Sequence, residues 1–485
     1  MRTRFLIRIT AVCLLAATGS AQTTSQSFLQ STSSPLGRGQ KGWSIYNITG
    51  SFGYSTLALP VDQLAFSLQR LESDYDGTAS ASFGYNYKGE KGAVSLLYSP
   101  SLVGRVRYSD LNAFNQSLNL TASRQIAPRW DLSVSVAGSD TSLDQALFTP
   151  AILSGSTTPV ATLDDLIRAS SGGQYTSDQL ASFLTGTPYV VTPSRSLVFG
   201  TKYFTTGLNT SLKHRYSPRL SFEVSLGASR TQTRNNSRQD LQGQLNFLIP
   251  RMTSEQAGVS MDYSWSPRTQ IGVRGTASQI DSTLGRYIVG NTRLFVSRKL
   301  TPHWFASVSA GPAFLEVLRL GIFAGFRQPS GLGYAADGNV GYTMGDHSLM
   351  ASYTRSVGDT FGFQSASSDS AGGSWQWAPA GRLWVLYASG GLQRLRGGVL
   401  GDVQFAQANV GLARYLNRQF SVNFTYGYVD RRTGGAAAAG ILQQNLNGFS
   451  TRVTLVWSPE GQLERQASRK AAGDTGAGGN REPSR

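Results

Sequence analysis

Apolar and polar residues alternate one for one over much of the chain. From Phe420 to Tyr428, apolar side chains at every second position are separated by Ser, Asn, Thr and Gly. The same alternation runs from Leu220 to Ala228, from Trp130 to Val136 and from Val259 to Trp265. Because successive side chains of a β-strand point to opposite faces, each segment is predicted to be a strand with one apolar and one polar face.

Short turn signals separate these segments. Pro presets the backbone at the first central position of a turn, and Asn, Asp and Gly suit the other positions. The predicted turns are Ala127-Pro128-Arg129-Trp130, Ser217-Pro218-Arg219-Leu220, Ser266-Pro267-Arg268-Thr269, Thr301-Pro302-His303-Trp304, Gly345-Asp346-His347, Ala378-Pro379-Ala380 and Leu416-Asn417-Arg418. Longer connections rich in Ser, Gly, Asp and Gln lie between them. Short turns that alternate with long loops are typical of outer-membrane β-barrels.

The segments add up to about eighteen strands, within a range of roughly 16 to 20. Their centres lie near Ile48, Phe83, Leu96, Leu120, Val134, Leu208, Val224, Met261, Val273, Leu294, Val308, Val340, Ala351, Trp375, Val385, Val410, Phe424 and Val453. The sequence therefore predicts an all-β fold: a single transmembrane, antiparallel, up-and-down β-barrel with short helices in its loops. An even strand number would place both chain ends on the short-turn side of the barrel.

A soluble β-sandwich is the alternative, since its strands alternate in the same way. A chain this long would need several sandwich domains, yet no linkers separate the repeats. Aromatic residues also gather at the turn ends of the strands, which favours a girdle at one membrane interface. These residues are Trp130, Tyr216, Trp265, Trp304, Trp377, Tyr415 and Trp457.

The two ends of the chain differ from its middle. Residues 1–21 combine a basic start, a short apolar stretch and small residues before Ala21, which indicates a signal peptide cleaved after Ala21. Residues 22–42 are expected to be a flexible segment, residues 43–457 the barrel, and residues 458–485 a disordered tail.

Helical patterns interrupt the strands in a few places. Apolar residues recur at helical spacing in residues 60–71, and short helices are predicted at 162–167 and 177–184. The last two lie in an insert from Asp140 to Arg195 that is too long for an idle loop. This insert either folds into the lumen or covers its mouth, or it forms an ordered loop that faces solvent.

Composition excludes several classes of protein. Of 485 residues, 11% are aromatic and 15% are charged, and the formal net charge is +16. A disordered chain would have fewer aromatics, and a cytosolic enzyme would normally be nearer one quarter charged. No apolar run beyond the N-terminus is long enough for a membrane helix. Cys13 lies inside the predicted signal peptide, so the mature chain would have neither disulfides nor zinc-thiolate sites.

No residue pattern indicates catalysis, a cofactor or a metal, and the chain is interpreted as a non-enzyme. His214, His303 and His347 lie beside predicted turns without metal-ligand spacing and are interpreted as interface histidines. No nucleophile elbow is present. Asp74-Tyr75-Asp76-Gly77 could hold calcium in an extracellular loop, but it lacks the twelve-residue spacing and is interpreted as a turn.

Basic residues on the polar phase of the strands are the most informative charges. A charge that faces mid-bilayer lipid costs roughly 2–4 kcal/mol, so these side chains are expected to face the lumen and to favour anions. Alternatively, many lie at the rims and pair with lipid phosphates. Nucleic-acid binding is not expected, because the charges are spread over many strands. The residues are Lys88, Arg105, Arg107, Lys213, Arg215, Arg274, Arg293 and Arg452.

Two motifs carry a family resemblance. The Ser-Pro-Arg turn in Tyr216–Phe222 leads into an alternating strand, and the last strand, Phe449–Trp457, ends on an aromatic residue. From Trp43 to Trp457 the chain resembles bacterial outer-membrane β-barrels, and more narrowly the large, poorly characterised barrels encoded beside exopolysaccharide and exosortase-type systems. The resemblance implies a Gram-negative outer membrane, contact with its lipid, assembly by the barrel insertion machinery, and periplasmic export components or an anionic polysaccharide as partners.

These observations leave two functions open. The first is a porin-like conduit for an anionic solute or for exopolysaccharide export. The second is a structural or adhesion barrel with a plugged lumen and active surface loops, which the long insert supports.

Overall fold

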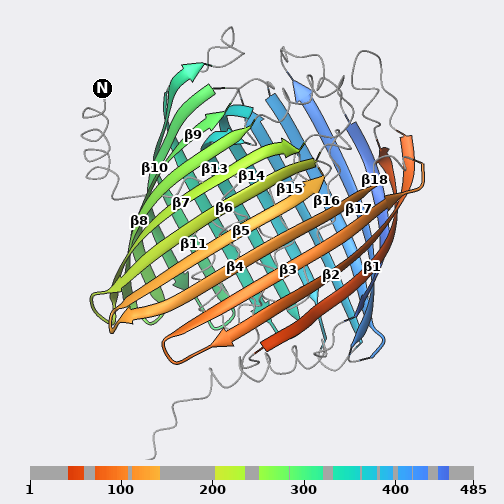
Figure 1. The fold of residues 1–485 in the computed structure, drawn as a ribbon, viewed down its shortest axis with the longest axis horizontal. Coiled ribbons are helices and arrows are strands. Elements are labelled where there is room, and N and C mark those ends of the chain that lie inside the picture. Colours follow the sequence, from red (N-terminus) through yellow and green to blue (C-terminus); the bar gives the residue numbers. More distant parts are fainter. Residues whose placement is uncertain are drawn as a thin grey trace, which may run out of the picture.

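The computed structural model describes residues 42–58, 72–107, 112–142, 202–234, 251–282, 285–320, 331–360, 363–379, 383–396, 402–417, 419–434 and 446–457. They form one closed, antiparallel sheet of eighteen strands (Figure 1). The strands are β1 Gly42–Ala58, β2 Glu72–Lys88, β3 Gly92–Arg105, β4 Ala113–Ala127, β5 Trp130–Ser142, β6 Lys202–Arg215, β7 Leu220–Arg234, β8 Met252–Ser266, β9 Thr269–Ser282, β10 Gly285–Lys299, β11 Trp304–Leu320, β12 Gly331–Met344, β13 His347–Thr360, β14 Phe363–Trp377, β15 Trp384–Arg396, β16 Asp402–Tyr415, β17 Phe420–Gly434 and β18 Leu446–Trp457.

The predicted fold class is confirmed. Each strand pairs with its neighbours in the sequence, and β1 also pairs with β18, from Ile48 opposite Trp457 to Ser55 opposite Ser450. In Figure 1 the red β1 and the blue β18 run side by side. Each predicted strand centre lies inside a strand. The closed ring leaves no edge strand, so every strand has a hydrogen-bonding neighbour on both sides.

Several predictions fall outside the described residues. These are the signal peptide, most of residues 22–42, the helical patterns at 60–71, 162–167 and 177–184, and the tail at 458–485. The insert begins later than predicted, because β5 continues through Asp140 to Ser142. Within the described part of the chain, no helix is long and apolar enough to cross a membrane.

The two edges of the barrel differ in their connections. At one edge, called the short-turn edge, two to six residues join each pair from β2–β3 to β16–β17. At the other, called the long-connection edge, the joining segments include residues 59–71, 143–201, 235–251 and 435–445. Three connections there, 283–284, 361–362 and 397–401, are short as well. Strand β1 begins and β18 ends at the short-turn edge, so the barrel has the predicted asymmetry.

Side-chain oxygens hold the short turns in place. The Oγ1 of Thr301 accepts hydrogen bonds from the backbone N–H groups of His303, at 3.2 Å, and Trp304, at 3.0 Å. The Oδ1 of Asn417 accepts two such bonds in the β16–β17 turn, and Ser217 does the same between β6 and β7. A hydroxyl or amide before the central residues therefore replaces backbone partners that the chain reversal removes.

The alternation in the sequence becomes two faces of the barrel wall. On β18, Val453 and Leu455 are 47% and 45% exposed, whereas the intervening Thr454 and the next residue, Val456, are 5% and 1% exposed. The exposed phase of the other strands is likewise mostly apolar, and the buried phase contains most of the Ser, Thr, Asn and Asp residues. We call these the outer face and the inner face.

The inner face is less uniformly polar than the pattern predicts. Ile280 on β9, Tyr287 and Val289 on β10 and Leu315 on β11 are all at most 6% exposed and pack together near the long-connection edge. They share the phase of inner polar residues such as Asn291. An apolar cluster therefore stiffens this part of the inner wall by burying its own surface.

The aromatic residues predicted to form a girdle lie at the short-turn edge. Trp130, Tyr216, Trp265 and Trp304 are 38–66% exposed, and Trp377 and Trp457 share the phase of exposed apolar neighbours. Tyr415 departs from the prediction: it is 3% exposed and packs on the inner face with Val385 and Ala413. The sequence pattern also overlooked two outer tryptophans at this edge, Trp43 and Trp384.

Candidate functional site

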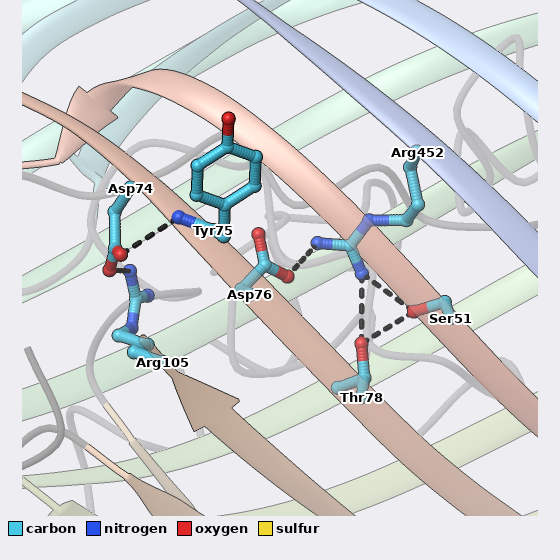
Figure 2. A network of polar contacts seen from close by, with 7 residues as sticks. All are labelled: Ser51, Asp74, Tyr75, Asp76, Thr78, Arg105 and Arg452. Atoms are coloured by element: carbon cyan, nitrogen blue, oxygen red, sulfur yellow. Dashed lines mark hydrogen bonds and ion pairs between the residues drawn. The ribbon is translucent and has the colours of Figure 1, made fainter. Parts of the chain in front are cut away.

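A polar network on the inner face crosses the seam where the barrel closes. The Nη2 of Arg452 on β18 donates to the Oδ2 of Asp76 on β2 at 2.5 Å. Its Nη1 donates to the Oγ1 of Thr78, at 3.0 Å, and to the Oγ of Ser51, at 3.3 Å. Figure 2 shows the guanidinium turned toward all three residues. One arginine thus bonds to side chains from both β1 and β2.

A glycine makes room for this ion pair. Gly53 on β1 lies opposite both Arg452 and Asp76 in the strand register. A Cβ at Gly53 would lie 3.1 Å from the Oδ1 of Asp76 and 3.4 Å from the Nε of Arg452. The absence of a side chain at Gly53 therefore leaves space for Asp76 and Arg452 to meet across β1.

Asp74 continues the network toward β3. Its Oδ2 lies 4.0 Å from the Nη1 of Arg105, and both side chains are at most 4% exposed. Its Oδ1 accepts from the backbone N–H of Arg107, at 3.0 Å. Asp74 and Asp76 therefore lie on β2, which corrects the interpretation of this segment as a loop turn. Arg107 is also not a strand residue, because β3 ends at Arg105.

A second network lies halfway around the ring of eighteen strands, centred on β10. Arg293 on β10 forms an ion pair with Asp337 on β12, across β11. Its Nε also donates to the Oδ1 of Asn291, at 3.2 Å, and Ser309 on β11 donates to Asp337 at 2.5 Å. The side chains of Arg293 and Asp337 are each 5% exposed. This pair is buried in the wall in the same way as the pair at the seam.

Arg274 on β9 is the more accessible member of the second network. It lies directly opposite Arg293 in the β9–β10 register. Its Nη2 is 3.7 Å from the Oδ1 of Asp262 on β8, and its guanidinium lies 4.5 Å from the ring centre of Phe295. Its side chain keeps 19% of its surface exposed. Four charged side chains therefore form a row on the inner face from β8 to β12, in which two arginines lie between two carboxylates: Asp262, Arg274, Arg293 and Asp337.

The remaining predicted lumenal residues lie close to the short-turn edge. Arg215 on β6 donates to the Oδ2 of Asp131 on β5 at 2.5 Å, and its side chain is 55% exposed. Lys213 shares the inner phase of β6 and lies between Asp131 and Glu223 in the register. Lys88 is the last residue of β2. Arg215, like Arg105, Arg274, Arg293 and Arg452, is thus paired with a carboxylate one or two strands away, and this pairing depends on the strand register.

The acidic residues and histidines of the described part of the chain do not gather into a metal-binding group. No group of three or more His, Cys, Asp or Glu side chains that could hold a metal ion occurs there. His214 stacks on Trp130 at 4.2 Å, the Nδ1 of His303 lies 2.9 Å from the Thr343 carbonyl, and His347 accepts from Trp375 at 3.4 Å. His214 and His347 thus contact aromatic side chains at the short-turn edge, and His303 contacts the backbone of β12 there. What the inner wall offers is an array of positioned charges.

Comparison with known proteins gave similarity in solved structures only. No protein-family model and no curated protein matches the chain. Outer membrane protein opdK from Pseudomonas aeruginosa is 11% identical with a TM-score of 0.41, covering 85% of this chain and 98% of that one. Pseudomonas aeruginosa OccK2 (OpdF) is 10% identical with a TM-score of 0.45, covering 87% and 100%. A BenF-like porin from Pseudomonas fluorescens is 8% identical with a TM-score of 0.44, covering 86% and 98%. The barrel architecture itself rests on the strand pairing described above.

Proposed function

We propose that the protein is an outer-membrane channel that conducts small anionic solutes. The observation that carries the membrane part is the outer face of the closed barrel, where large apolar side chains such as Val453 and Leu455 are nearly half exposed. In water this surface would be unfavourable, at roughly 25 cal/mol per Å² of apolar area. In a bilayer it is matched to lipid, and the aromatic side chains at the short-turn edge suit the interface.

The selectivity part rests on the accessible arginines of the inner face. Arg293 and Arg452 are almost completely enclosed by their partners, whereas Arg274 and Arg215 keep 19% and 55% of their side chains exposed. A guanidinium stays charged at any physiological pH. Arg274 and Arg215 are therefore the residues that a passing anion would meet, while Arg293 and Arg452 mainly hold the wall together.

Export of an anionic exopolysaccharide is a narrower form of this hypothesis. A positive lumen would suit both a polymer and a small anion, and no described contact distinguishes them. A structural or adhesion barrel with a plugged lumen is the second candidate. The insert on which it depends lies outside the described residues apart from Asp140–Ser142.

Planar-bilayer recording tests the proposal. The purified barrel in a salt gradient near 0.1 M should conduct, and its reversal potential should indicate anion preference. The preference should weaken near 1 M, where the Debye length falls from about 10 Å to about 3 Å. Substituting Arg215→Gln together with Arg274→Gln should move the reversal potential toward zero. Arg414→Gln, on the outer face over Trp384, is the matched control and should change nothing. An open but cation-selective channel would refute the anion preference, and a closed one would favour the structural barrel.

A further inference from the structure

Three consecutive turns at the short-turn edge carry an arginine directly after a proline. The pair recurs between β4 and β5, between β6 and β7, and between β8 and β9. We call these arginines the turn arginines: Arg129, Arg219 and Arg268. The turns do not need arginine for their geometry, because the next one, between β10 and β11, has His303 at the same position and makes the same backbone contact.

The backbone of each turn arginine is held by the neighbouring hairpin. The three carbonyl oxygens each accept a hydrogen bond at 2.8 Å, from the backbone N–H groups of Arg215, Ser264 and Lys299 near the ends of β6, β8 and β10. The side chains are exposed. The Nη1 of Arg129 donates to the carbonyl oxygen of Tyr216, at 3.1 Å. The linked turns therefore hold three guanidinium groups at regular points along the edge.

This stretch of the edge has an excess of positive charge. Within the described residues, no carboxylate forms an ion pair with a turn arginine. Asp131, the carboxylate on β5 next to the first of these turns, is paired with Arg215. Glu223 lies opposite Lys213 in the β6–β7 register, so these two charges offset each other. The three turn arginines are therefore not compensated.

The turn arginines lie on the inner phase of the barrel wall. Arg129 directly precedes Trp130, whose side chain is on the outer face, and it shares the phase of Asp131. The other two turn arginines hold the same place before Leu220 and Thr269, the first outer-phase residues of β7 and β9. Consecutive turns are two strands apart, so the three arginines follow about 20 Å of the rim at the usual strand spacing. They thus border the mouth of the lumen, away from the lipid-facing tryptophans.

We propose that the turn arginines bind small multivalent anions at the short-turn mouth of the barrel. Guanidinium groups bind carboxylate and phosphate oxygens through paired hydrogen bonds, and like charges around a mouth raise the local concentration of their counterions. An anion with several charges gains from more than one arginine at once, whereas a monovalent anion does not. The proposal rests on the proposed function for the route of the solute and narrows its class, but the binding itself requires neither an open pore nor a bilayer. Lipid phosphates have the same chemistry, and the inner phase of the arginines favours the free solute.

The test is a calorimetric titration of the full-length barrel in nonionic detergent with inorganic tripolyphosphate, at about 0.1 M salt, where the Debye length is about 10 Å. The triple variant Arg129→Gln, Arg219→Gln, Arg268→Gln should bind at least about threefold more weakly, since each exposed ion pair contributes about 1.4- to 5-fold. The substitutions leave the backbone bonds of the turns intact, so the barrel should fold.

A second triple variant is the matched control, because it removes the same charge from the same edge on the outer phase. Its substitutions are Arg124→Gln, Arg298→Gln and Arg414→Gln. This variant should bind tripolyphosphate as the unmodified barrel does. Phosphatidylglycerol added to the micelles should not displace the tripolyphosphate.

Equal binding by the turn-arginine variant and the unmodified barrel would overturn the proposal, and so would equal weakening by the control variant. Displacement by phosphatidylglycerol would also overturn it, because the site would then bind lipid headgroups. In planar bilayers, tripolyphosphate should reduce the current at a lower concentration from one side than from the other, and the turn-arginine variant should lose this difference. An anion-selective barrel that fails the titration refutes only the turn site. A barrel that binds as expected but does not conduct refutes only the channel.

Discussion

Asp76 and Arg452 are 376 positions apart in the sequence, yet their side chains meet at 2.5 Å over the backbone of β1. Neither residue belongs to the strand that they bridge. Their side chains are 4% and 11% exposed, so the pair is held away from bulk water. It connects the beginning of the sheet with its end at the position where the barrel closes.

Breaking this pair from one side should destabilise the barrel. Arg452→Gln leaves the Asp76 carboxylate without its principal cation in a buried setting, which should lower the free energy of unfolding by about 3 kcal/mol. Asp76→Asn with Arg452→Gln should cost clearly less than the sum of the two single changes, because no buried charge then lacks a partner. Urea unfolding in vesicles, followed by tryptophan fluorescence, measures the cycle. Additive single effects would show that the two residues are not coupled.

Substitution of Gly53, which lies between Asp76 and Arg452, should also destabilise the barrel. Gly53→Val would push methyl groups into the space between Asp76 and Arg452, at a cost of roughly 1–3 kcal/mol. Gly50→Val on the same strand is the control, because a Cβ there would have nothing within 4 Å. The temperature at which the folded band shifts on a semi-native gel should fall for Gly53→Val alone. Similar shifts for both variants would mean that β-strand glycines matter here for another reason.

Asp262 should limit anion preference rather than create it. Its Oδ1 lies 3.7 Å from Arg274 and accepts no hydrogen bond, so Asp262→Asn should fold normally and leave Arg274 less compensated. The reversal potential of the channel should then move further toward the anion limit, opposite in sign to Arg274→Gln. A shift in the same direction for both variants would contradict the assignment of Arg274 as the accessible charge.

The asymmetry of the two edges predicts which residues face the periplasm. A cysteine at Asp346, in the short turn between β12 and β13, should be protected from an impermeant thiol reagent on intact cells. A cysteine at Arg432 is expected to react, because its side chain is 71% exposed near the long-connection end of β17. Labelling at Asp346 with protection at Arg432 would reverse the orientation.

The strands could be predicted because two local rules agree along the chain. A period of two defines each strand, and a turn with Ser, Thr or Asn before Pro or Arg ends it, as at Ser217 and Thr301. Neither rule needs information from distant residues. The number and order of strands in an up-and-down barrel then follow from counting, since neighbours in sequence are neighbours in space.

The pairing of charges could not be predicted in the same way. Which carboxylate meets Arg452 or Arg293 depends on the register of strands, and in both cases the partner lies beyond the adjacent strand. Asp74 and Asp76 were misinterpreted because Asp-Tyr-Asp-Gly has the composition of a turn, although their two-residue spacing also suits one face of a strand. Tyr415 was assigned to the girdle because it adjoins a turn, and its phase on β16 placed it inside.

The seam between β1 and β18 also constrains the order of folding. Until residues 446–457 are available, β1 has an unpaired edge, and its backbone groups on that side can bond to another chain. Local contacts can form each hairpin early, but pairing of the first and last strands requires loop closure over almost the whole sequence, which is slow. A chain released before Arg452 would have its hairpins and an open edge but no ring. The late arrival of one strand thus makes this protein dependent on protection from aggregation during its assembly.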